Sequence, residues 1–397
     1  MNHPNDSARP DRVAKALADG FWARADENDA TGTFPKRNFE ELSAAGLLTL
    51  NVPVAQGGAG LGPEAGKPLE LWKVTRAIAY GDPPTGQCFH VHANEIDILL
   101  GLATPPQVEQ FLRPVVERRL ILGGYGSQLT DSKPTIARRT KTGWVLDGKK
   151  FFCTNSDAAG AALVWALVEG DADPSDRIQV FYVSHGVAGM TVERDWWAQF
   201  QGMRATTSHV VAFDHVEVDE SAALGQPGDY LKRDLQPRAY CQFASSFIGI
   251  ADRLLAEARK AVEFRRLGGE ASAVAKLGQS RVLIDAAWGL VEQAAEAYKA
   301  GDPQARFRAL GARYFAEQAV RTGLENTLDN VGTYAASKAS GLSRLVRDIN
   351  LYIRHESRDR ILHTIGLTQL DREVDASFSG DNPILKGLQR EHHSTHS

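Results

Sequence analysis

The stretch GWVLDGKKFFCTNSDAAGAALVWALV, residues 143–168, decides the fold of this chain. It contains two short runs rich in β-branched and aromatic residues, WVLDGKKFFCTN and ALVWALV, which are typical of strands. Turn signals accompany them at Lys141-Thr142-Gly143 and at Asp147-Gly148. Because no helical pattern separates these strands, the stretch predicts an antiparallel sheet or barrel and argues against alternating β/α units.

The same pattern extends outward and then ends on both sides. Further strand-like runs, among them LILGGYGS, IQVFYVS and HVVAFDHVEV, extend the predicted β domain over residues 120–222. Apolar residues before it recur at three and four, as in NFEELSAAGLL, so residues 1–119 are predicted to be helical. Helical periodicity returns in residues 223–397, with long amphipathic stretches predicted at Ala251–Arg266, Ala271–Ala300 and Ala305–Val331. Long helices with short connections indicate a bundle.

Composition excludes several classes of protein. The 397 residues carry a formal net charge of -4, which offers no general basic field for nucleic acid or anionic lipid. The longest apolar run, Ala161–Val168, is far shorter than the roughly 18 residues that a membrane span needs. The N-terminus has no apolar segment, so we expect a cytoplasmic protein. Three cysteines without CxxC spacing are expected to be buried free thiols, with no structural metal.

Two short motifs could be over-interpreted. GGAGLG, residues 57–62, lacks a dinucleotide-loop frame, since Pro63 stands where the last glycine is needed. HVHANEID, residues 90–97, offers possible metal ligands, but histidines at i and i+2 on a helix face different sides. We therefore expect a cavity-lining or core histidine here and no metal ligand, and we assign His92 to the residues that contact substrate. The histidine-rich tail QREHHSTHS is expected to be an unstructured polar terminus.

Four ordered segments together resemble the acyl-CoA dehydrogenase superfamily. They are LLTLNVPVAQGGAGL, the opening stretch at residues 143–168, WWAQFQGMRATTSHVVAFDHVEV and RDINLYIRHES. The resemblance covers nearly the whole chain. It implies an α+β fold with an N-terminal helical domain, a central antiparallel β-barrel or sheet domain and a C-terminal four-helix bundle.

The resemblance also implies a flavin, either reduced FMN or FAD, held between the β domain and the bundle. A flavin needs hydrogen-bonding groups along its polar edge and apolar cover over its rings. Ser127 falls where the family contacts that edge, Phe152 where an aromatic side chain stacks on the rings, and Thr154 where a hydroxyl meets the flavin near N5. Arg265, or Arg266 in the next register, lies near the family's arginine for a flavin phosphate.

Departures from the dehydrogenase pattern favour one branch of the superfamily. Where dehydrogenases usually carry TEPxAGSD, this chain has GSQLTDSKP, and where they carry GGYGY it has NVGTYAASKASGLSRLVRD. The latter segment is similar to two-component flavin-dependent monooxygenases that oxidise dibenzothiophene, organosulfur compounds, aromatic rings or amino sugars. Their W-x-x-x-G-x-R-x-T-x-S passage is matched by Trp197, Gly202, Arg204, Thr206 and Ser208.

The pair His355-Glu356 admits two mechanisms in one register. Glu356 falls where dehydrogenases place the base that abstracts the α-proton, and His355 where the monooxygenase branch places a histidine. That histidine would stabilise a flavin hydroperoxide or deprotonate the substrate. Dehydrogenases follow the glutamate with glycine, whereas Ser357 follows here, which favours His355. Tyr352, where the branch has a further histidine, is expected to contact substrate.

Three hypotheses therefore remain in order. The first is a monooxygenase that acts on a small aromatic or heteroatom-containing molecule with reduced flavin from a separate reductase, since no NAD(P)H-binding motif is visible. The second is an FAD-containing acyl-CoA dehydrogenase-like enzyme with Glu356 as base. The third is a non-catalytic relative that keeps the fold. The long, Ala-rich bundle and the resemblance to this superfamily together predict a homotetramer, or at least a homodimer, and the substrate stays open.

Overall fold

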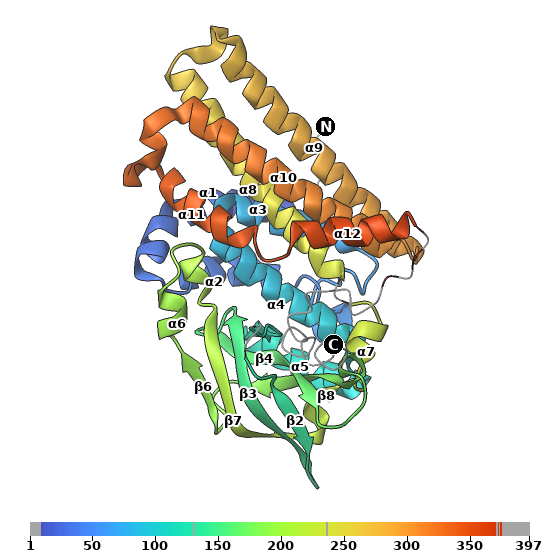
Figure 1. Ribbon diagram of the computed structural model, residues 1–397. Helices are drawn as coiled ribbons and strands as arrows, with labels where there is room; N and C mark the ends of the chain where they lie inside the picture. Colours follow the sequence, from blue (N-terminus) through green and yellow to red (C-terminus); the bar gives the residue numbers. More distant parts are fainter. Residues whose placement is uncertain (1–8, 130–131, 236, 371, 373, 375–397) are drawn as a thin grey trace, which may run out of the picture.

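A computed structural model describes residues 9–129, 132–235, 237–370, 372 and 374, so the histidine-rich tail lies outside the described residues. Helices from the first part of the chain lie between the sheet and the long C-terminal helices (Figure 1). These helices are α1 (Pro10–Thr31), α2 (Lys36–Ala44), α3 (Pro68–Gly81) and α4 (Pro83–Leu102), whereas α5 (Pro105–Glu117) packs on the sheet. Helix α4 is buried along most of its length and has strand β1 on one side and helix α8 on the other.

One eight-stranded sheet forms the middle of the molecule. Its strands are β1 (Ile121–Tyr125), β2 (Ile136–Arg139), β3 (Gly143–Cys153), β4 (Ala159–Val168), β5 (Ile178–Ser184), β6 (Met190–Glu193), β7 (His209–Asp219) and β8 (Ala223–Leu224). The order is β6-β7-β3-β2-β4-β5-β8, with β1 added on β4. Most neighbours are antiparallel, as expected, but β1 and β2 both run parallel to β4.

The opening stretch contains one turn fewer than its sequence predicts. Residues 140–143 do form the hairpin between β2 and β3. The predicted turn at Asp147-Gly148 is wrong, because β3 continues through it with an irregular register against β7. Gly148 adopts φ 135°, and a Cβ there would lie 2.7 Å from the Cα of Thr135. Glycine at this position allows the bulge in β3 and the close approach of its backbone to Thr135.

Long helices dominate the C-terminal part. They are α8 (Pro237–Phe264), α9 (Ala271–Ala300), α10 (Ala305–Val331), α11 (Leu342–Tyr352) and α12 (Arg358–Thr368), preceded by the short helices α6 (Asp195–Ala198) and α7 (Asp229–Lys232). Helix α8 packs against α3, α9 and α10, and these helices share one apolar core. The first half of α8 is buried on nearly every side. It therefore lacks the amphipathic periodicity from which the helical stretch Ala251–Arg266 was predicted. Within the described residues, no helix combines the length and apolar character needed to cross a membrane.

All three cysteines are buried free thiols, as expected.

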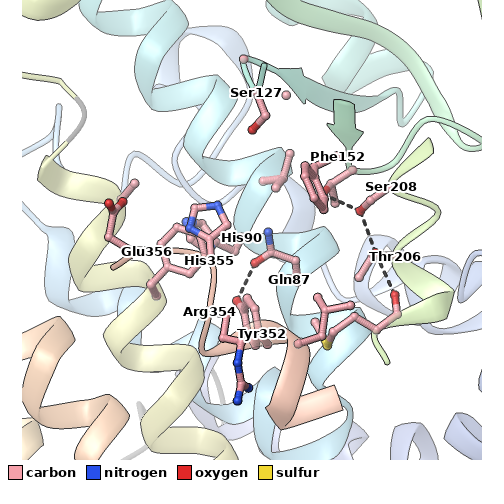
Figure 2. A pocket seen from close by; sticks show the side chains of 18 of the residues that line it. Gln87, His90, Ser127, Phe152, Thr206, Ser208, Tyr352, Arg354, His355 and Glu356 are labelled. Atoms are coloured by element: carbon pink, nitrogen blue, oxygen red, sulfur yellow. Dashed lines mark hydrogen bonds between the residues drawn. The ribbon is translucent and has the colours of Figure 1, made fainter. Parts of the chain in front are cut away.

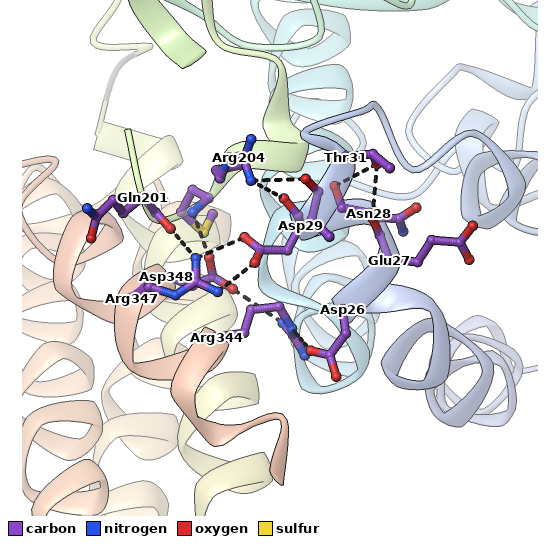
Figure 3. A network of polar contacts seen from close by, with 12 residues as sticks. Asp26, Glu27, Asn28, Asp29, Thr31, Gln201, Arg204, Arg344, Arg347 and Asp348 are labelled. Carbon is purple, nitrogen blue, oxygen red and sulfur yellow. Dashed lines mark hydrogen bonds and ion pairs between the residues drawn. The ribbon is translucent and has the colours of Figure 1, made fainter. Parts of the chain in front are cut away.

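Polar contacts hold helix α11 against α1 and against the segment before β7 (Figure 3). Arg347 on this helix pairs with Asp29 of α1 at 2.6 Å, and Asp348 accepts a 2.6 Å hydrogen bond from the main-chain N–H of Met203. Gly202 lies so close that a Cβ there would stand 2.2 Å from the carbonyl oxygen of Arg347. The segment before β7 therefore fixes the position of α11.

Candidate active site

A cavity of about 870 Å³ opens between the sheet, helix α4 and the C-terminal helices. Most of its wall comes from one face of α4, the ends of β1 and β3 with the segment before β7, and α8 together with residues 347–356. Trp165 and Tyr230 complete it. Ser127, Phe152, Thr154, Tyr352, His355 and Glu356, six of the residues singled out from the sequence, all line it (Figure 2).

Helix α4 contributes His90 to the cavity, not His92. The His92 ring is fully buried on another face, where its Nε2 lies 2.8 Å from the carbonyl oxygen of Leu48 and its Nδ1 accepts a hydrogen bond from the N–H of Leu122. Burial lowers the pKa of His92 to about 4, so the ring is neutral. The expected substrate contact of His92 is corrected by this geometry, because residues two apart on a helix point about 200° apart.

His90 is the histidine of α4 that lines the cavity, the position that was predicted for His92. Burial and the nearby His355 lower the pKa of His90 to about 3. Its Nδ1 is buried and has no hydrogen-bond partner among the described residues. Gln87, three residues earlier on the same helix, accepts a hydrogen bond from the hydroxyl of Tyr352. The helical spacing of Gln87 and His90 was the signal that could have identified this face.

Phe152 belongs to an aromatic group on the sheet side of the cavity. Its ring meets those of Trp196, Trp197 and Phe200 edge-on, at centroid distances of 4.9 Å, 6.2 Å and 6.0 Å. The side chain remains 38% exposed, which is unusual for a phenylalanine packed on three aromatic neighbours. An exposed aromatic surface of this kind can cover a flat ligand.

Hydroxyl groups form a buried row beside this aromatic group. The Oγ1 of Thr154 lies 2.9 Å from the Oγ of Ser208, which lies 2.7 Å from the Oγ1 of Thr206. All three residues line the cavity, and Ser127 lines it from the segment after β1. Hydroxyls donate and accept, so the row can adapt to a ligand edge that presents both kinds of group.

The backbone at this wall is held in an uncommon conformation. Four non-glycine residues have positive φ: Phe152 (53°), Asn155 (70°), Met203 (53°) and Thr207 (44°). The Nδ2 of Asn155 donates to the carbonyl oxygens of Cys88 and Leu122, both at 3.0 Å, and ties the end of β3 to α4 and β1. Such strain persists only where the surroundings hold it, and it is typical of functional sites.

Residues 353–357, between α11 and α12, bring His355 and Glu356 to the cavity. The rings of His355 and His90 both pack on Phe243, each at a centroid distance of 4.3 Å. Figure 2 shows the two imidazoles close together, facing Ser127 and Phe152 across the cavity. A pair of histidines thus faces the hydroxyl and aromatic wall.

Buried charges beneath the cavity hold the segment that carries His355. Arg313 and Glu317 of α10 form a fully buried ion pair at 3.0 Å. Arg313 also donates to the carbonyl oxygen of Ile353 and lies 4.2 Å above the ring of Phe247. Arg358, at the start of α12, lies 3.7 Å from Glu317. Both ends of the segment are therefore anchored to α10.

Arg265 does not reach the cavity of its own chain. It follows α8 and donates a 2.6 Å hydrogen bond to the carbonyl oxygen of Asn330, at the far end of α10. Arg266 beside it has φ 59° and does not line the cavity either. Neither register of the predicted phosphate arginine is brought together with Ser127, Phe152 and Thr154 within one copy.

Comparison with known proteins agrees with this architecture. Residues 7–119, 123–216 and 241–360 match the N-terminal, middle and C-terminal domain models of acyl-CoA dehydrogenase. The chain belongs to the acyl-CoA dehydrogenase family.

Two curated relatives in this family are named as monooxygenases. Dibenzothiophene monooxygenase of Rhodococcus qingshengii is 30% identical over 271 residues, which are 65% of this chain and 63% of the relative. A probable FMNH2-dependent monooxygenase, SfnC of Pseudomonas putida, is 27% identical over 66% of this chain and 64% of its own length. The chain thus spans somewhat less than two thirds of the curated relatives that it matches.

A solved structure extends the similarity to nearly the whole fold. Dibenzothiophene monooxygenase TdsC of Paenibacillus sp. A11-2 has a TM-score of 0.83 and 25% identity, covering 93% of this chain and 99% of TdsC. The same protein has also been solved with FMN bound. The similarity to TdsC therefore covers nearly all of the architecture described above.

Proposed function

We propose that this chain is a flavin-dependent monooxygenase that oxidises a small organosulfur or aromatic compound with reduced flavin from a separate reductase. The similarity to relatives named as monooxygenases carries this proposal. The fold alone does not, because the dehydrogenases of the family share it. FMN is the favoured flavin, since TdsC has been solved with FMN and SfnC is named for its reduced form.

The cavity fits a flavin. It combines an exposed aromatic surface at Phe152 with a buried hydroxyl row that includes Thr154 and Ser208, which matches a flat ring system with a polar edge. Ser127 would meet the polar edge, Phe152 would cover the rings, and Thr154 would donate to a ring nitrogen. When bound, a reduced flavin supplies the electrons that activate dioxygen.

His355 is the proposed acid/base. It lines the cavity, packs on Phe243 and lies near the neutral His90, so a proton on an imidazole nitrogen can be delivered to the reacting region or taken from it. Phe243 and Tyr352 are buried and limit the access of water to this side. Arg313 and Arg358 act through the segment that carries His355 and are positioning residues.

Dehydrogenation with Glu356 as base is the second candidate, since Glu356 lines the same cavity. Ser357, in place of glycine, counts against it, because glycine lets the backbone approach the thioester closely. A non-catalytic relative is the third candidate.

Purified protein distinguishes the three candidates. We expect colourless protein that binds reduced FMN and, with a reductase and oxygen, converts dibenzothiophene or a related sulfide to an oxygenated product. Tightly bound FAD bleached anaerobically by an acyl-CoA would favour dehydrogenation. Failure to bind any flavin would favour the non-catalytic candidate.

The proposal includes an assembly and a location. A homotetramer built on the C-terminal helices would let Arg265 of one copy approach a flavin phosphate in another, which explains why it has no place in its own cavity. We also propose a cytoplasmic location, because the three cysteines are free thiols, as in a reducing compartment.

A further inference from the structure

Glu95 of α4 lines the cavity but has no role in the proposed chemistry. Its side chain occupies a notch opposite Gly124 of β1, where a Cβ would lie 2.4 Å from its Oε1. Any other residue at position 124 would therefore displace the carboxyl. The residue is 3% exposed.

Half of this carboxyl group has no partner. Oε1 accepts a 3.3 Å hydrogen bond from the side chain of Asn94, whereas Oε2 has no hydrogen-bond partner among the described residues. A buried polar atom left in this state is costly, so it is found where a ligand or water completes its bonding.

The carboxyl is also not balanced by a positive charge. Burial raises its pKa well above the usual value, Asp97 raises it further, and only the amide of Asn94 opposes this. The neutral acid carries an O–H group, which is a hydrogen-bond donor. A cationic ligand would instead favour the ionised form of this carboxyl.

A second unused donor lies in the same wall. Trp165 of β4 lines the cavity, and its indole N–H is buried without a hydrogen-bond partner among the described residues. Its ring meets that of Tyr230 at 5.4 Å, and Tyr230 lies close enough to Glu95 for the carboxyl to affect its pKa. Both groups therefore lie near Tyr230 in the cavity wall.

We propose that Glu95 recognises a neutral hydrogen-bond acceptor on the substrate, such as a carbonyl, sulfoxide or ring-nitrogen atom, while the aromatic wall holds an uncharged flat ring. The inference rests on the proposed function in taking the ligand of this cavity as the substrate. The inference specifies that the substrate carries a hydrogen-bond acceptor and that Glu95 binds this atom.

Equilibrium dialysis of the full-length, flavin-free protein with fluorene and 9-fluorenone tests this assignment. The two ligands share one ring skeleton and differ by a carbonyl oxygen. We expect the wild type to bind 9-fluorenone about tenfold more tightly than fluorene, the size of effect that one buried hydrogen bond supplies. Glu95→Gln keeps an N–H donor and should keep a preference, whereas Glu95→Met should bind the two ligands within about twofold.

Asp97→Asn is the matched control. Asp97 is a buried carboxyl two residues further along α4, but it does not line the cavity and bonds to Asn51 at 2.9 Å. Burial is the largest cause of the raised pKa of Glu95 and Asp97 the smallest, so this variant should keep the wild-type ratio. Thermal unfolding followed by circular dichroism checks that each variant is folded, and the wild-type ratio stands without any variant.

Three results overturn the assignment: equal binding or no binding of the two ligands by the wild type, an undiminished preference in folded Glu95→Met, or tightest binding of cationic 9-aminofluorene. Binding of reduced FMN and oxygenation of dibenzothiophene, measured on the same wild-type preparation, test the proposed function separately. The proposed function can therefore survive the loss of this assignment.

Discussion

His355 and Glu356 are adjacent in the chain and both line the cavity, so only substitution separates their roles. Under oxygenation, His355→Ala removes the acid/base and should lower the turnover rate by about 10² to 10⁴, while the affinity for reduced FMN stays nearly unchanged. Glu356→Gln should be milder. Single-turnover oxidation of dibenzothiophene, together with a separate flavin titration, measures both quantities.

The opposite ranking would support dehydrogenation. In that case Glu356→Gln abolishes flavin bleaching by an acyl-CoA, and His355→Ala has a small effect. Unchanged turnover in both variants would remove the pair from the mechanism altogether.

The candidate site was predictable residue by residue where a motif fixes the register. Ser127, Phe152, Thr154, Tyr352 and the final pair line the cavity because they occupy fixed places in the family's segments. The role of His92 was wrong, since a two-residue shift on α4 turns a side chain to another face. The sequence around Arg265 does not indicate that its side chain bonds to Asn330, away from the cavity of its own chain.

At the scale of elements, the packing of α11 against the segment before β7 depends on Gly202. A Cβ there would stand 2.2 Å from the carbonyl oxygen of Arg347, so Gly202→Ala must push α11 away from the segment before β7. The displacement weakens the ion pair of Arg347 with Asp29 and the hydrogen bond that Asp348 accepts. We expect the free energy of unfolding to fall by about 2 to 4 kcal/mol in urea titration.

Gly278→Ala is the matched control for this prediction. Gly278 lies inside α9, and a Cβ there would meet nothing within 4 Å. The change should stabilise the protein by roughly 0.5 to 1 kcal/mol, because alanine loses less backbone entropy in a helix than glycine. Equal effects of the two substitutions would contradict the close approach at Gly202.

Elements were predictable where their periodicity is one-sided. Helices Ala271–Ala300 and Ala305–Val331 have the bounds that the sequence indicated. The first half of α8 is buried nearly all round, and its polar residues Gln242, Ser245 and Ser246 are buried too, so no exposed face marks it in the sequence. Strand β4 pairs in parallel with β1 and β2. The alternating pattern of a strand does not indicate which other strand it pairs with, so these pairs were not predicted.

At the scale of the whole molecule, stability should depend on pH through buried acids such as Asp97. Burial raises the pKa of Asp97 to about 7 from an ordinary value of 3.8, so the folded state binds a proton that the unfolded state has released between these values. The resulting stabilisation is complete below the lower pKa and is lost as pH rises towards 7.

Asp97→Asn removes this contribution. Relative to the variant, the free energy of unfolding of the wild type should fall by up to a few kcal/mol between pH 4 and pH 7, and change little above that range. Urea titration at a series of pH values measures it. Gly278→Ala, which does not titrate, should differ from the wild type by the same amount at every pH.

The long C-terminal helices also leave apolar side chains uncovered in a single copy. Phe264 at the end of α8 is 89% exposed, Val282 of α9 is 67% exposed, and Leu362 of α12 is 44% exposed. A second copy that covered these side chains would remove apolar surface from water. We expect a homotetramer in sedimentation velocity, and Val282→Glu should shift the distribution towards smaller species while His355 and the cavity stay intact. A wild type that sediments only as a monomer of 43.3 kDa would exclude this assembly, and with it a place for Arg265 in a neighbouring flavin site.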